Sequence, residues 1–146
     1  MINELTPAQI RRIKQSLPSS DTTNSIAAAI NFFKHQLRLE LDFNTVEDTS
    51  GNYTVSVGIF GLILAKSEPD RRKKIAKENA STSLLDKLNA LSEPKREAFI
   101  KIVCGRTNIT EEEACALNDI IPLIDLEYPP EEYSAEKSTV PDWESN

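Results

Sequence analysis

Residues 73–88 have the sequence KKIAKENASTSLLDKL, and this stretch decides which fold the chain can adopt. Its main apolar positions recur at steps of four residues and are Ala76, Ala80, Leu84 and Leu88. Side chains four residues apart lie on one face of an α-helix, and Ile75 and Leu85 widen this stripe. The small residues in the middle allow such a helix to approach a sheet closely. The stretch therefore predicts a helix that packs on a sheet.

The residues before this helix predict the sheet. After Ser25, the run IAAAINFFKHQL has its apolar residues at helical spacing, with little polar surface, and predicts a largely buried helix. In LRLELDFNTV (37–46) the apolar residues alternate with polar ones and are Leu37, Leu39, Leu41 and Phe43, the pattern of a half-buried strand. YTVSVGIF (53–60) and LILAKS (62–67) predict two more strands, with a tight reversal at Phe60–Gly61. Short turns favour an antiparallel meander, so we expect an α+β fold with the order α-β-β-β-α.

The chain divides into four expected parts. Thr6-Pro7 begins a helix that Pro18 ends, which gives an N-terminal helix and linker over residues 1–20. The α+β domain is expected at 22–90, a helical extension at 91–125 and an acidic, flexible tail at 126–146. Ser92 and the pair Thr110 and Glu113 predict two helix starts in the extension. The apolar stripes of these two helices predict that residues 92–121 pack on the α+β domain or on a partner.

The composition argues against several classes of protein. The chain of 146 residues is 39% hydrophobic and 27% charged, as expected for one globular domain, and it contains no apolar run long enough to span a membrane. It has one His, two Cys without a CxxC motif, and only four Gly, so neither a zinc site nor a phosphate-cradling loop is predicted. We expect a protein without catalytic residues, cofactor or metal, in a reduced compartment, the cytoplasm or the nucleus.

The order of the elements and the KKIAKENASTSLLDKL helix resemble the double-stranded-RNA-binding domain family. Lys73, Lys74, Ala76, Lys77 and Ala80 match the K-K-x-A-K pattern and the small residues with which the family's last helix begins. Upstream, INFFKHQLRLELDFNTVED resembles the family's first helix and first strand, and YTVSV its second strand. The resemblance covers residues 25–89 and is that of a degenerate member. It implies shape-based binding of duplex RNA through phosphates.

Two other contact regions of that family are not preserved. The family's Gly-Pro-x-His loop between the first two strands is replaced by EDTSGN (47–52), which has two acids and no His. Phe32 stands where the family's first helix has a Glu that touches ribose hydroxyls. These departures favour a different function, in which the domain associates with a protein partner or with a second copy.

Five basic residues gather around the start of the last domain helix: Arg71, Arg72, Lys73, Lys74 and Lys77. Cations at a helix N-terminus oppose the helix dipole unless an anion binds there. A phosphate backbone would use both the side chains and the free N–H groups, so these residues are the predicted RNA-binding site. The alternative is a solvated charged surface.

The predicted partner-binding residues are Phe32, His35 and Trp143. Adjacent Phe32 and Phe33 point in different directions on a helix, so one of them is expected in the core and the other exposed. The sequence therefore leaves two functions open. One is weak, sequence-independent binding of duplex RNA within an RNA-related complex, and the other is a protein-association or homodimerisation module that has lost RNA binding.

Overall fold

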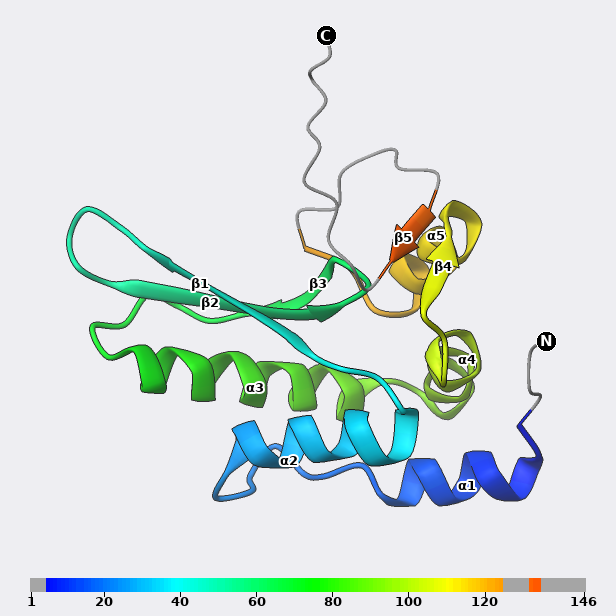
Figure 1. Ribbon diagram of the computed structural model, residues 1–146. Coiled ribbons are helices and arrows are strands. Elements are labelled where there is room, and N and C mark those ends of the chain that lie inside the picture. The colour runs from blue at the N-terminus through cyan, green and yellow to red at the C-terminus, as the bar shows by residue number, and fades with distance from the viewer. Residues whose placement is uncertain (1–4, 125–131, 135–146) are drawn as a thin grey trace, which may run out of the picture.

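Figure 1 shows the computed structural model of the chain, which describes residues 5–124 and 132–134. In chain order the elements are α1 (Pro7–Gln15), α2 (Ser25–Asn31), the π-helix η1 (Phe32–Leu37), β1 (Asp42–Glu47), β2 (Tyr53–Ile59), β3 (Leu62–Lys66), α3 (Lys73–Ala90), α4 (Glu93–Val103), β4 (Asn108–Thr110), α5 (Glu111–Ile120) and β5 (Glu132–Ser134). A three-stranded antiparallel sheet in the order β1-β2-β3 packs on α3, with helices before and after it. The predicted α+β fold class is confirmed.

The core lies between the sheet and α3. The predicted stripe of α3 is buried, and it faces the buried side chains Val55, Val57 and Ile59 of β2. Figure 1 shows α2 packed against α3 on the same side of the sheet, running in the same direction. The reversal between β2 and β3 occurs where predicted, because Phe60 and Gly61 both adopt positive φ angles, of 57° and 77°.

The predicted start of the first strand is wrong. β1 begins at Asp42, whereas Leu37 ends η1 and Leu39 follows it. Arg38, between the two leucines, adopts the left-handed conformation (φ 60°), and the Leu39 N–H donates to the Phe33 carbonyl at 2.8 Å. This reversal buries both leucines, which are 0% and 8% exposed. Their alternation with polar residues therefore arises from the end of a helix and not from a strand.

The predicted packing of residues 92–121 on the domain is confirmed. Phe99, Ile100 and Val103 of α4, together with Leu117 of α5, belong to the same buried core as the sheet and α3. Both predicted helix starts are confirmed too, with a Ser92 cap on α4 and a capping box of Thr110 and Glu113 on α5. The Lys14 ammonium of α1 also holds α4, since it donates to the carboxylates of Glu93 and Glu97 at 2.6 and 2.7 Å.

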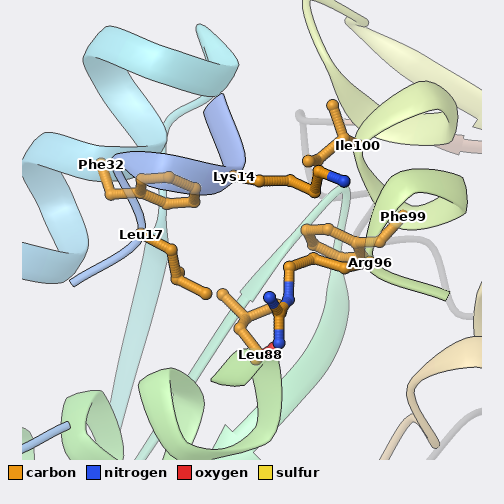
Figure 2. Close-up of a pocket in the computed structure, with 7 residues that line it drawn as sticks. All are labelled: Lys14, Leu17, Phe32, Leu88, Arg96, Phe99 and Ile100. Atoms are coloured by element: carbon orange, nitrogen blue, oxygen red, sulfur yellow. The ribbon is translucent and has the colours of Figure 1, made fainter. Parts of the chain in front are cut away.

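A small cavity remains where the N-terminal helices meet α3 and α4 (Figure 2). Its lining residues are Lys14, Leu17, Phe32, Leu88, Arg96, Phe99 and Ile100. The cavity measures about 10 Å³, which is roughly the space of one water molecule. It is a gap in the packing and too small to admit a ligand.

The last described segment is β5, which pairs antiparallel with β4 as a separate two-stranded sheet. Residues 132–134 of the predicted tail are thus a strand, and the remainder of the predicted tail lies outside the described residues. Among the helices of residues 5–124, none is long and apolar enough to cross a membrane.

Candidate nucleic-acid interface

The segment before α3 is fixed to the sheet by backbone hydrogen bonds. The Tyr53 N–H donates to the Asp70 carbonyl at 2.7 Å, and the Asp70 N–H donates back to the Tyr53 carbonyl at 3.0 Å. Two residues further into β2, the Ser67 N–H donates to the Val55 carbonyl at 2.8 Å, while the Ser67 hydroxyl accepts the Val55 N–H at 2.9 Å. This ladder sets the position of the basic residues that follow.

The α3 helix begins at Lys73, with Arg72 as its N-cap residue. Within residues 5–124, no side chain caps this end, so the N–H groups of the first turn keep their capacity to donate. Arg71 and Arg72 precede the helix, while Lys73, Lys74 and Lys77 belong to it. Asp70 organises the entry, because its Oδ1 accepts the Arg72 N–H at 2.8 Å. The structure thus brings all five predicted basic residues to one helix end, and we call them the basic cluster.

Two lysines of the basic cluster rest on aromatic rings of the sheet. Lys73 Nζ lies 5.2 Å from the ring centre of Tyr53, and Lys77 Nζ lies 4.5 Å from the ring centre of Phe43. Both distances are within the range of cation–π attraction. These rings restrict the two ammonium groups to positions beside the sheet. Neither ring is predicted from the sequence to belong to the site, because their roles follow from the strand register.

The charge of the basic cluster is poorly neutralised from within the chain. Within residues 5–124, only Arg72 has a carboxylate within salt-bridge distance, and its Nε lies 3.9 Å from Asp70 Oδ1. Arg71, Arg72, Lys73 and Lys74 are exposed, and Lys77 is partly buried. Four of the five cations therefore have no salt bridge in the described structure, and the site can accept an anion.

An acidic hairpin tip lies at the same end of the sheet as the start of α3 (Figure 1). Glu47 pairs in register with Tyr53, and Asp48 begins the turn that follows. The Asp48 Oδ1 accepts the N–H groups of Ser50 and Asn52 at 2.8 and 2.9 Å, so this carboxylate closes the turn. The tip offers carboxylates where a nucleic-acid-binding loop would offer cations or neutral donors.

The two predicted partner-binding residues that the structure describes, Phe32 and His35, do not form a shared surface, because only His35 is exposed. The expectation that one of the two adjacent phenylalanines is exposed is wrong, because Phe32 is 6% exposed and Phe33 is fully buried. Their rings pack edge to face at 5.7 Å, and Phe33 in turn contacts Phe99 of α4. His35 is exposed on η1, and η1 follows α2 at the end of that helix pair away from the start of α3 (Figure 1). Trp143 lies outside the described residues.

No family of known proteins has a model that matches this chain, and no curated protein is similar to it in sequence. No group of three or more His, Cys, Asp or Glu side chains in the described ranges is arranged to hold a metal ion. The basic cluster is therefore the candidate site, and its geometry is the basis for assigning a function.

Proposed function

We propose that this protein binds duplex RNA weakly and without sequence preference, through the basic cluster at the start of α3. The observation that carries the proposal is the combination of five cations with an uncapped helix end. A phosphate group can accept hydrogen bonds from the backbone N–H groups and from the flanking side chains at the same time.

The seating of Lys73 and Lys77 on aromatic rings supports the same proposal. A lysine side chain loses considerable rotamer freedom when it binds a phosphate, and that loss weakens binding. The rings of Tyr53 and Phe43 restrict the two side chains before any ligand arrives. Part of the entropy cost is therefore met during folding. An A-form duplex, whose phosphates flank a deep and narrow groove, is the ligand that the family resemblance implies.

Weak binding follows from the use of a single contact region. The hairpin tip, which carries Glu47 and Asp48, lies at the end of the sheet where α3 begins, and its carboxylates repel a phosphate backbone. This acidic tip favours a second function, association with a protein partner in the absence of RNA. A partner with its own basic surface would contact the tip, while the cluster would contact an acidic surface.

The proposal is tested by titrating the full chain against a fluorescently labelled RNA duplex of about 20 base pairs, long enough for one domain of this size. Anisotropy is measured at several salt concentrations, with two duplexes of unrelated sequence. We expect the same affinity for both duplexes and a steep loss of affinity with salt, because binding to phosphates releases counterions.

A triple variant and a matched control localise the contact. Replacing Lys73, Lys74 and Lys77 by Ala should raise the dissociation constant by about tenfold or more and lower the salt slope by roughly one unit per lost phosphate contact. The control replaces Arg11, Lys95 and Lys101, which are exposed on α1 and α4, and changes the net charge by the same amount. Equal losses in both variants would contradict a localised site. Failure of the unaltered chain to bind RNA at low salt would favour the second function.

A further inference from the structure

The two edges of the sheet differ in how many of their backbone hydrogen-bonding groups the chain itself pairs. At the β3 edge, the Ile63 carbonyl accepts the Ile124 N–H at 2.9 Å. The next carbonyl, that of Leu64, accepts the Lys87 ammonium of α3 at 2.8 Å. At the β1 edge, no strand within residues 5–124 or 132–134 lies beside β1 except β2. An additional strand can therefore join the sheet at β1.

The register of the hairpin identifies which backbone groups are free at this edge. The Asp48 N–H donates to the Asn52 carbonyl at 2.8 Å, so these two residues form a hydrogen-bonded pair. In an antiparallel ladder such pairs recur at every second residue, so along β1 every second residue from Asp48 bonds to β2. The backbone groups of Phe43, Thr45 and Glu47 accordingly point away from β2. This edge presents three N–H donors and three carbonyl acceptors in a regular row.

β1 has few of the features that usually keep an edge strand from pairing. It contains neither Pro nor Lys, and its six residues pair with β2 without a bulge, so its only protecting charges are the carboxylates of Asp42 and Glu47. Five of the six residues are exposed, including Val46 at 56%. α3 packs on β2 and β3, and the face of β1 on that side is only partly covered, at Phe43. A further strand can thus add to the sheet without displacing the helix.

We propose that two copies of this chain associate through their β1 edges, antiparallel and about a twofold axis at Thr45. In this register Thr45 lies opposite Thr45 of the second copy, and Phe43 lies opposite Glu47 of the second copy. All three free N–H groups and all three free carbonyls of each edge are then paired, which makes one continuous six-stranded sheet. Other antiparallel registers either pair fewer of these groups or run into the turn at Asp48.

The charges on β1 and α3 select the same register. Lys77 Nζ lies 4.5 Å from the ring centre of Phe43. Directly opposed side chains of antiparallel strands are about 5 Å apart, so Glu47 of the second copy comes beside this ammonium. The twofold axis creates the ion pair twice. The same register also places Asp42 opposite Asp48 of the second copy at each end, a like-charged pair that opposes association. The two N–H groups that hold the Asp48 carboxylate in its own turn reduce this repulsion.

Sedimentation equilibrium of the full chain, without RNA and from micromolar to millimolar concentration, tests the association independently of the proposed function. We expect the mean mass to rise toward twice that of the monomer. Thr45→Pro removes an outward N–H and places its ring on the free edge, so it should raise the dimer dissociation constant by at least about tenfold. Thr45→Val keeps the N–H and the branched side chain, and should leave the constant within about twofold of the original. A chain that stays monomeric, or a dimer that Thr45→Pro does not weaken, would overturn the proposal.

A charge exchange gives a second test that does not depend on how well the proline variant folds. Glu47→Lys and Lys77→Glu each create like-charged contacts in their own homodimer, so each variant should dimerise more weakly than the unaltered chain. In an equimolar mixture, Lys at 47 faces Glu at 77, and the unaltered Glu47 faces the unaltered Lys77. The mixture should therefore recover dimers that neither variant forms alone. A mixture that behaves as the average of its two components would overturn the proposed register.

Discussion

The ammonium group of Lys77 on α3 lies 4.5 Å from the ring centre of Phe43 on β1, although the two residues are more than thirty positions apart in the chain. This contact joins the edge strand to the first turns of the helix. It also determines where one cation of the basic cluster stands before any ligand binds. Lys73 and Tyr53 form the equivalent contact one helical turn earlier.

The first prediction concerns the Phe43 ring itself. Phe43→Leu keeps an apolar side chain at this position but removes the aromatic face that attracts Lys77. We expect duplex RNA affinity to fall between about two- and fivefold, because Lys77 then loses more rotamer freedom on binding, at a cost of about 0.5–1 kcal/mol. Phe43→Trp retains an aromatic face and should bind RNA at least as well as the unaltered chain. Anisotropy titrations of both variants measure the effect, and equal affinities would show that the ring does not position Lys77.

The second prediction assigns Phe32 to the core. Its ring is 6% exposed and packs against Phe33, so Phe32→Ala leaves a cavity beside α1 and α4. The free energy of unfolding should fall by about 3–5 kcal/mol, as measured by urea denaturation. As a control, Val46→Thr changes a side chain that is 56% exposed and should cost less than about 0.5 kcal/mol. A small effect of Phe32→Ala would mean that this ring contributes little to the packing.

The helix α3 could be predicted from the sequence because its signals are local. The four-residue spacing from Ala76 to Leu88 fixes the buried face whatever the partner, and the reversal at Phe60–Gly61 joins two strands through adjacent residues. The start of β1 could not be predicted in this way. A left-handed Arg38 is uncommon for a residue with a side chain, and apolar alternation from Leu37 to Phe43 has the period of a strand.

The basic cluster was predictable for the same reason, since its five residues are neighbours in sequence. The supporting rings were not, because Tyr53 and Phe43 reach Lys73 and Lys77 only through the register of the sheet. The burial of Phe32 depends on α1 and α4, which come from opposite sides of the domain in sequence. A helix that is covered by other elements on two sides buries both members of an adjacent aromatic pair. The local sequence around such a pair does not indicate that a second element covers it.

The third prediction concerns Glu113, whose carboxylate binds the Arg106 guanidinium through two bonds of 2.9 and 3.0 Å. Burial raises the pKa of Glu113, but the hydrogen bonds from Arg106 and Thr110 outweigh burial, so its pKa lies below the ordinary 4.5. A lowered pKa in the folded chain stabilises the fold above the unfolded pKa. That contribution is lost as the pH falls through the folded pKa.

Glu113→Gln should therefore lower the free energy of unfolding by up to about 1 kcal/mol at pH 7, since Gln can still complete the capping box but not the ion pair. The difference from the unaltered chain should shrink as the pH falls below 4.5. Urea denaturation at a series of pH values measures both quantities. Glu112→Gln, one residue earlier on an exposed position, makes the same charge change and should show a smaller difference at pH 7. Parallel behaviour of the two variants would rule out the Arg106 pair as the cause.

The last prediction separates two effects of Asp48. Its Oδ1 accepts two backbone N–H groups and closes the hairpin turn, while its charge lies at the end of the sheet where α3 begins. Asp48→Asn keeps the acceptor oxygen and removes the charge, whereas Asp48→Ala removes both. Urea denaturation reports the role in the turn, and RNA titration at low salt reports the role of the charge.

We expect Asp48→Asn to leave the free energy of unfolding within about 0.5 kcal/mol and to tighten RNA binding by about two- to threefold at low salt. Asp48→Ala should lose about 1 kcal/mol of stability and gain the same factor in affinity. Because the repulsion acts through solvent, the gain in affinity should shrink as salt is added. Unchanged RNA affinity in both variants would place the hairpin tip away from the bound duplex, since a carboxylate beside the phosphates must repel them.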